Sequence, residues 1–291
     1  MSLANPADTR LPFFAYGLFR PGQPAFFQIG GFVRDVLNPC DVPGSLFVRD
    51  GLPLMNPSAD WGKVRGALLA FEPEAAKAAY RRIGKMEPQN HYEWQETKAG
   101  SARANVLVDR VPEAKGDYVD GPVWNAWSDP LFTTALEVVG EMYEENRSRD
   151  AGLGPDAALR PFFKLQMAYL LLWSAIERYL ALRYNLLHAQ RQVSKFASER
   201  AFKEGLKAHC TKPRRVLRAD NPNEVLECRP NDPAGSARYY YQVRCNVTHR
   251  GKGVLNEFRH LKYSLAELLP IFRSMLKAAE DESGWPIAET R

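Results

Sequence analysis

The stretch Phe14-Ala15-Tyr16-Gly17-Leu18-Phe19-Arg20-Pro21-Gly22 introduces the pattern on which the N-terminal half of the chain is built. A short apolar run at residues 13–16 is followed by glycine and then by proline. Runs of this kind, bounded by Gly and Pro, are typical of β-strands that end in turns. Backbone N–H groups of a glycine-containing turn can hold an anionic ligand. We therefore expect a strand and then a turn at residues 16–18, which either packs beside a core aromatic or contacts a ligand.

Similar apolar runs recur as far as about residue 123. They lie at residues 45–48, 66–71 and 104–108. One helix is expected among them over residues 72–83, because Glu72, Pro73 and Glu74 suit the first turn of a helix. This half of the chain is therefore predicted to be mixed, with several strands and one helix.

Beyond residue 127 the apolar residues recur at the spacing of helices. Helices are predicted at residues 131–146, 161–187, 193–208, 238–249 and 265–279, with polar or Pro-rich loops at 150–161 and 212–236. The longest of them begins with a proline, which is favoured at the first helical position. The second half is therefore predicted to be an all-α bundle.

Composition narrows the class of protein. The 291 residues are 45% hydrophobic and 25% charged, as in ordinary globular domains, and the length favours two domains. No run of 18 uninterrupted apolar residues is present, and the N-terminus lacks an export signal, so we expect a cytoplasmic protein with no membrane span. The four cysteines contain no Cys-x-x-Cys pair, and the five histidines are scattered. Reduced thiols, no metal and no cofactor are expected.

Charge differs strongly between the two halves. Residues 1–155 contain 16 Lys and Arg against 20 Asp and Glu, whereas residues 156–291 contain 23 against 14. A surplus of positive charge on one domain is expected of a protein that binds phosphates, although basic surfaces also occur without nucleic acid.

Residues 14–22 resemble the Y-G-[TS]-L-R-x-G opening of the γ-glutamylcyclotransferase-like fold. Three later stretches follow that family's order: VPGSLF at 42–47, VRGALL at 64–69, and IGKMEP at 83–88 before an aromatic at Tyr92. The resemblance covers about residues 11–110. It implies a mixed, β-barrel-like domain, assigned to residues 1–125, with a small-ligand pocket at Tyr16, Gly17 and Leu18.

The same resemblance gives Glu87 the role of the glutamate that moves a proton. The chain has Gly84 and Pro88 where the family has Asp and Gly, and Trp94 where it has Arg. A carboxylate held in a cavity suits general acid–base chemistry. Three interpretations of Glu87 stay open: a solvated loop carboxylate, a remnant that binds a ligand, or a working general base.

The stretch YYYQVRCNVTHRGK at residues 239–252 resembles the R-x(4–6)-H signature of the HEPN superfamily, and SAIERY at 174–179 resembles its early helix. The resemblance implies a HEPN-type helical domain, assigned to residues 161–291 after a connecting helix and linker at 126–160. It also implies that Arg244 and His249 are catalytic, with Asn246 as a polar auxiliary. Arg250 and Lys252 would attract the RNA backbone.

The chemistry of RNA cleavage without a metal suits this pair. Arg244 supplies a permanent cation for the phosphate, and His249 supplies a group that titrates near neutrality. Residues five apart lie about 140° apart around a helix, so one copy does not place them side by side. A symmetric homodimer would bring both pairs into one cleft. The alternative is structural: an interhelix ion pair for the arginine and a helix-terminal position for the histidine.

The leading expectation is an α+β, two-domain endoribonuclease that cleaves RNA as a homodimer without metal. By resemblance, it would act in bacterial defence or toxin-like growth control, and its first domain would sense a ligand or inhibit cleavage. Two alternatives stay open. One is a cyclotransferase acting on γ-glutamyl amines, which requires Glu87 to face a cavity beside Tyr16 and Gly17. The other is a non-catalytic module that binds nucleic acid or protein.

Overall fold

The computed structural model describes residues 3–57, 62–111, 116–119, 121–148, 155–218, 221, 223–249 and 254–284. The chain forms two compact units. The first comprises residues 1–127, 182–185 and 280–291, and the second comprises residues 128–181 and 186–279. The α+β class is confirmed, since strands dominate the first unit and helices the second.

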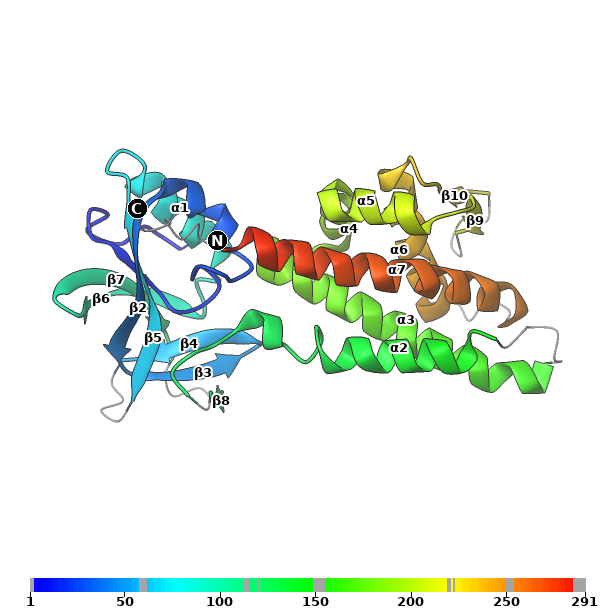
Figure 1. Ribbon diagram of the computed structural model, residues 1–291, viewed down its shortest axis with the longest axis horizontal. Coiled ribbons are helices and arrows are strands. Elements are labelled where there is room, and N and C mark those ends of the chain that lie inside the picture. The colour runs from blue at the N-terminus through cyan, green and yellow to red at the C-terminus, as the bar shows by residue number, and fades with distance from the viewer. Residues whose placement is uncertain are drawn as a thin grey trace, which may run out of the picture. The chain divides into compact units, whose positions relative to one another are not determined.

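Unit 1 contains a five-stranded sheet (Figure 1). Its spatial order is β2, β5, β1, β7, β6, and all neighbours are antiparallel except β1 and β7. The central strand β1 is fully buried, as expected of a short apolar run enclosed on both faces. The bounds are β1 Phe13–Ala15, β2 Val33–Pro43, β5 Lys63–Phe71, β6 Tyr92–Ala99 and β7 Ala102–Asp109.

A second, three-stranded sheet has the order β4, β3, β8, with β3 at Ser45–Arg49, β4 at Leu52–Asn56 and β8 at Asp117–Tyr118. Asp50 and Gly51 join β3 to β4, and both have positive φ, at 53° and 70°. Asp-Gly is a favoured pair for such two-residue hairpins. Within the described residues the two sheets do not close into a barrel, so the barrel-like arrangement is not seen there.

Helix α1 (Ala76–Met86) covers buried side chains of the larger sheet. The ring of Tyr80 contacts the rings of Phe13, Phe71 and Trp94 edge-on, at centroid distances of 5.3–6.3 Å. Its hydroxyl donates to the carbonyl oxygen of Leu11 at 2.8 Å. The helix starts a few residues later than its sequence predicts. Three short 3-10 helices complete the unit: η1 Phe26–Gln28, η2 Gly30–Phe32 and η3 Ala126–Ser128.

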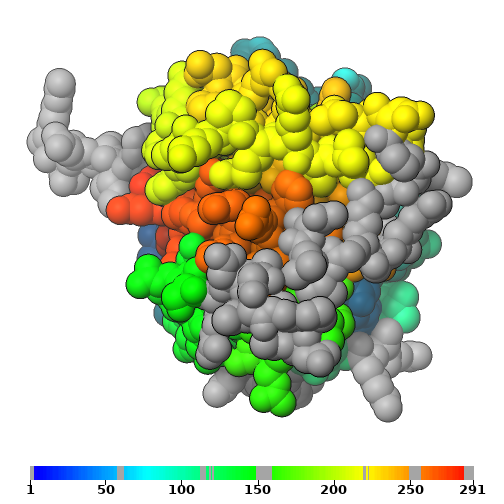
Figure 2. Space-filling view, turned by 90° about the vertical axis from the view of Figure 1, so that its right-hand side faces the viewer, coloured from blue at the N-terminus to red at the C-terminus, as the bar shows by residue number. Residues whose placement is uncertain are grey.

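Unit 2 is built on long helices. Its elements are α2 Thr134–Asn146, α3 Pro155–Tyr184, α4 Ala189–Ser198, α5 Arg200–His209, β9 Arg214–Leu217, β10 Val225–Cys228, α6 Pro233–His249 and α7 Val254–Glu282, with the last residues of α3 and α7 in unit 1. Helix α7 lies between α2 and the segment α5–β10 (Figures 1 and 2). Arg273 on α7 donates to the Leu136 carbonyl oxygen of α2 at 2.9 Å.

Three features of unit 2 differ from the sequence prediction. The helix predicted at 193–208 is two helices, because Glu199 adopts extended backbone angles of −59° and 134° between α4 and α5. The loop predicted at 212–236 contains the antiparallel pair β9–β10, so the bundle is not purely helical. In addition, α3 begins before Pro161 and carries this proline inside the helix. Among the described residues, no helix combines the length and apolar character that a membrane span requires.

Candidate functional site

Glu87 directly follows the last residue of α1 and is buried, with 6% of its surface exposed. Its backbone is extended, and its N–H donates to the Ile83 carbonyl oxygen at 3.0 Å, which ends the helix. Its side-chain oxygen Oε2 is also buried and has no hydrogen-bond partner. The interpretation of Glu87 as a solvated loop carboxylate is therefore wrong. This carboxyl group is held inside unit 1, and one of its oxygens makes no hydrogen bond to the described residues.

A small cavity, partly open to solvent and with room for about one water molecule, lies beside Glu87. We call it the Glu87 cavity. Its wall brings together the turn after β1, the start of β4, and strands β6 and β7. The lining residues are Phe13, Ala15, Tyr16, Gly17, Leu18, Phe19, Pro53, Glu87, Tyr92 and Leu107.

Two tyrosine hydroxyls on this wall are bonded to the protein backbone. Tyr16 donates to the Leu107 carbonyl oxygen at 2.8 Å and accepts from the Met55 N–H at 3.2 Å. Tyr92 donates to the Pro53 carbonyl oxygen at 2.7 Å. These bonds join β4 to the strands of the larger sheet and fix both rings. Among the residues that line the cavity, only Glu87 carries a carboxyl group.

Burial raises the pKa of Glu87 to about 8. The lining residues include no Lys, Arg or His that would stabilise the charged form. Burial, followed by the charge of Glu87, raises the pKa of Tyr16. The free carboxyl is therefore mostly protonated at neutral pH and can exchange a proton close to it. A group poised in this range is suited to both accepting and donating a proton.

Gly17 allows the turn to approach β4 closely. A Cβ atom at this position would lie 2.8 Å from Cγ of Pro53, which is too close for an unstrained contact. The Gly17 carbonyl oxygen accepts from the Arg20 N–H at 3.0 Å and so closes the turn. The glycine of this motif is thus required by packing as well as by any ligand that the turn contacts.

The structure brings Tyr16, Gly17, Leu18 and Glu87 to one cavity. Pro53 and Leu107 also line the cavity, and the sequence analysis did not single them out. Each belongs to an ordinary apolar strand run, so no local signal distinguishes them. Leu107 is placed there by the pairing of β7 with β1, and Pro53 is held there by the hydrogen bond that its carbonyl oxygen accepts from Tyr92.

Arg244 lies on α6 with its side chain 26% exposed. Its Nη2 atom is 3.7 Å from Oε1 of Glu177 on α3, so the two segments that resemble HEPN helices meet at these side chains. The guanidinium also lies 5.7 Å from the centroid of the Tyr241 ring. The arginine is held loosely, and part of it remains open to solvent.

Asn246 is fully buried and bonded within unit 2. Its Nδ2 donates to the Leu217 carbonyl oxygen at 3.0 Å, and its Oδ1 accepts from Gln242 Nε2 at 2.8 Å. These bonds give it a structural role in tying α6 to β9. His249 is the last residue of α6, and its side chain lies outside the described part of the chain, as do Arg250 and Lys252. The convergence of Arg244 and His249 therefore stays a prediction.

No protein-family model matches the chain, and no curated protein matches it. Among solved structures, an uncharacterized protein from Pyrococcus horikoshii is similar over 39% of this chain and 88% of its own. The sequence identity is 18% and the TM-score is 0.33.

Proposed function

We propose that unit 1 is a cyclotransferase that acts on γ-glutamyl amines, with Glu87 as the group that moves the proton. The observation that carries this proposal is the burial of Glu87 in a cavity beside Tyr16, Gly17 and Leu18. A buried carboxyl at that place is what the reaction requires, whereas a solvent-facing one would have excluded it.

The reaction is an internal displacement. The α-amino nitrogen of the substrate attacks its own γ-carbonyl carbon, so a C–N bond forms and closes a five-membered lactam. The bond from that carbon to the leaving amine then breaks. One proton leaves the attacking nitrogen and one is needed by the departing nitrogen. Glu87 as carboxylate accepts the first and as carboxylic acid returns it to the second.

The apolar surroundings of Glu87 serve this exchange. Because burial raises its pKa to about 8, the carboxylate is a stronger base than an exposed glutamate. The hydroxyls of Tyr16 and Tyr92 donate hydrogen bonds to backbone carbonyl oxygens and so hold the cavity wall in place. Proton transfer is the role of Glu87. Holding the amine close to the carbonyl supplies a further part of the acceleration, since the two reacting groups then need no collision.

The test is turnover of a panel of γ-glutamyl amines and γ-glutamyl dipeptides by the full chain, with the lactam and the released amine both quantified. We expect equal amounts of the two products and a loss of about 10²–10⁴-fold in kcat for Glu87→Gln. Glu74→Gln is the matched control, because Glu74 is an exposed carboxylate before α1. Equal turnover by wild type and Glu87→Gln, or none by wild type on any member of the panel, would refute the proposal.

A second candidate function belongs to unit 2: metal-independent cleavage of RNA by a homodimer, with Arg244 and His249 as the reacting pair. The observation that favours it is the partial exposure of Arg244 beside a carboxylate no closer than 3.7 Å, which leaves the cation available to a phosphate. Unit 1 would then be the ligand-sensing or inhibitory part of the same chain.

Cleavage of total RNA in the presence of a metal chelator tests this second candidate. Arg244→Ala and His249→Ala should each abolish cleavage, whereas Arg238→Ala, an exposed arginine on the same helix, should not. Cleavage that survives both changes would contradict the mechanism. Salt-sensitive RNA binding without cleavage would instead indicate a binding module.

A further inference from the structure

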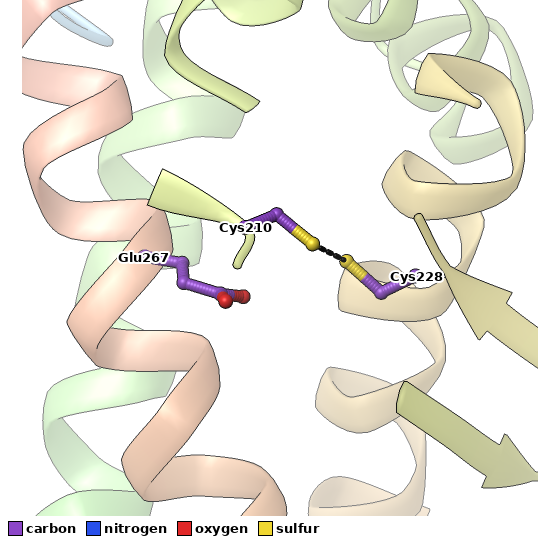
Figure 3. Close-up of side chains that lie close together, drawn as sticks. All are labelled: Cys210, Cys228 and Glu267. Carbon is purple, nitrogen blue, oxygen red and sulfur yellow. Dashed lines mark hydrogen bonds between the residues drawn. The ribbon is translucent and has the colours of Figure 1, made fainter. Parts of the chain in front are cut away.

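Two buried cysteines and a buried glutamate meet inside unit 2 (Figure 3). Cys210 follows the last residue of α5, Cys228 ends β10, and Glu267 lies in α7. Their exposed fractions are 1%, 0% and 5%. The two Sγ atoms are 3.4 Å apart, and the two sulfurs and a carboxylate oxygen all lie within 4.8 Å of one another. We call these three residues the Cys2Glu cluster.

The sulfur atoms are not bonded to each other, because a disulfide bond is about 2.05 Å long. Their separation is instead close to that of two thiolates on one tetrahedral ion, where metal–sulfur bonds of about 2.3 Å place the sulfurs about 3.8 Å apart. The Glu267 carboxylate points to the same space as both sulfurs (Figure 3). Three elements distant in the sequence therefore direct their ligand atoms to one point.

Two neighbours complete the surroundings of the Cys2Glu cluster. The Tyr240 hydroxyl donates to Glu267 Oε2 at 2.8 Å and lies 3.4 Å from Cys228 Sγ. Arg214 forms an ion pair with Glu267, and its side chain is only 15% exposed. Two thiolates and one carboxylate carry three negative charges, which a divalent ion and the Arg214 guanidinium together neutralise. A buried site with balanced charge avoids the large penalty for isolated charges in a protein interior.

We propose that Cys210, Cys228 and Glu267 bind a Zn²⁺ ion that fastens the β9–β10 hairpin to α7. Thiolate and carboxylate are established zinc ligands, and the Tyr240 hydroxyl hydrogen-bonds to both Cys228 and Glu267 beside them. The burial of all three ligands indicates a structural site, since a catalytic zinc keeps one position open to substrate. This proposal does not depend on the function of Glu87.

Binding exchanges protons for metal bonds. A cysteine thiol is mostly protonated at neutral pH, because its ordinary pKa is about 8.5. On binding, both S–H bonds break, two sulfur–zinc bonds form, and two protons pass to solvent. No electron is transferred. The apparent affinity should therefore increase as the pH rises.

The first experiment measures Zn²⁺ binding by the full chain. The protein is stripped with a chelator under reducing conditions and titrated with ZnCl₂ in competition with a chromophoric chelator. We expect one Zn²⁺ per chain, release of about two protons, and a rise in Tm of about 5–10 °C when free Zn²⁺ is about 100 times its Kd. No saturable binding to the folded, reduced chain would overturn the proposal.

The second experiment identifies the ligands by replacing Zn²⁺ with Co²⁺, whose spectrum contains a thiolate-to-metal charge-transfer band. Cys228→Ser should lose at least half of that band and weaken binding more than tenfold. Cys40→Ser is the matched control, because Cys40 is a buried cysteine on β2 of unit 1 and should leave the spectrum unchanged.

Glu267→Gln keeps the approximate shape of the side chain and both thiols, and so provides a second variant if Cys228→Ser does not fold. It should keep the charge-transfer band and weaken Co²⁺ binding more than tenfold. Equal binding by wild type, Cys228→Ser and Glu267→Gln would contradict the assignment. A further test treats the reduced wild-type protein with a low-molecular-weight disulfide and measures the rate at which a Cys210–Cys228 disulfide forms. An equal rate with and without Zn²⁺ would also contradict the assignment.

Discussion

The Tyr16 hydroxyl donates a hydrogen bond of 2.8 Å to the carbonyl oxygen of Leu107. It also accepts from the backbone N–H of Met55 at 3.2 Å. One side chain therefore joins the turn after β1 to β7 and β4, which are the strands that enclose the Glu87 cavity. Because Glu87 faces this fixed wall, its protonation and its access to a ligand depend on the same packing that stabilises unit 1.

The pH dependence of turnover should follow the ionisation of Glu87. The proposed mechanism starts from the carboxylate, and burial raises the pKa of this group to about 8. We expect kcat/KM for a γ-glutamyl amine to rise about tenfold per pH unit between pH 6 and 7 and to level off above pH 8. A profile that is already flat at pH 6 would show that Glu87 is not the base in the free enzyme.

The free energy of unfolding should fall as the pH rises, whereas kcat/KM should rise. The folded state holds the Glu87 proton up to about pH 8, whereas the unfolded chain releases it near the ordinary glutamate pKa of 4.5. The unfolded state therefore binds fewer protons between these values, and the free energy of unfolding falls as the pH rises. The stability from protonated Glu87 is fully present below pH 4.5 and is lost by about pH 8.

Glu87→Gln removes this dependence, because the amide stays neutral. Relative to wild type, the variant should gain stability between pH 5 and pH 9, by an amount on the order of 4 kcal/mol at most. Urea unfolding of wild type and Glu87→Gln at pH 5 and at pH 9 measures this gain in stability. A difference between the two proteins that stays constant with pH would indicate that the carboxyl ionises normally.

Gly17→Ala should lower turnover through packing. The added Cβ meets Pro53 Cγ at 2.8 Å, so the turn or β4 must shift at the wall of the Glu87 cavity. We expect a loss of stability of about 1–3 kcal/mol and a clear fall in kcat/KM, measured by urea unfolding and the product assay. Gly31→Ala is the control, since a Cβ there meets nothing within 4 Å and its φ is not positive. Equal effects at both sites would contradict the explanation.

Arg49→Ala should destabilise unit 1 strongly. Arg49 on β3 binds both carboxylate oxygens of Asp109 at the end of β7, at 3.0 and 2.7 Å, and the Asp109 side chain is 3% exposed. Removing the arginine leaves a buried carboxylate without its cation, which costs about 3–5 kcal/mol. The exposed pair Arg34–Asp35 is the comparison, and Arg34→Ala should change stability by less than about 1 kcal/mol. Chemical unfolding of Arg49→Ala and Arg34→Ala measures both losses of stability, and similar losses for the two variants would contradict this explanation.

Part of the candidate site could be predicted from the sequence, because its residues lie in short stretches with recognisable spacing. Gly17 occurs in a glycine turn after an apolar run, and Glu87 follows a helix that the acidic start at Glu72 and Glu74 predicts. The burial of Glu87 was not predictable from these stretches. It depends on contacts with residues distant in the chain, such as Pro53, which lines the same cavity in the folded unit.

The sequence was less informative about unit 2. Glu199 breaks one predicted helix into α4 and α5, although neither glycine nor proline marks the break. The Cys2Glu cluster was missed because its cysteines lack the close spacing of common zinc motifs, and Glu267 is contributed by a different helix. The resemblance to the HEPN signature implies that Asn246 is a catalytic auxiliary, whereas in the structure it is fully buried and hydrogen-bonded to Leu217 and Gln242.

The most direct test of the central claim is a titration of the Glu87 carboxyl carbon by NMR in protein labelled with ¹³C at glutamate, with Glu87→Gln used to assign the signal. We expect a resonance that titrates with a pKa of about 8, is missing from the variant, and shifts when an unreactive γ-glutamyl amine analogue is added. A Glu87 signal that titrates near 4.5 and ignores the analogue would contradict both the buried acid and its proposed chemistry.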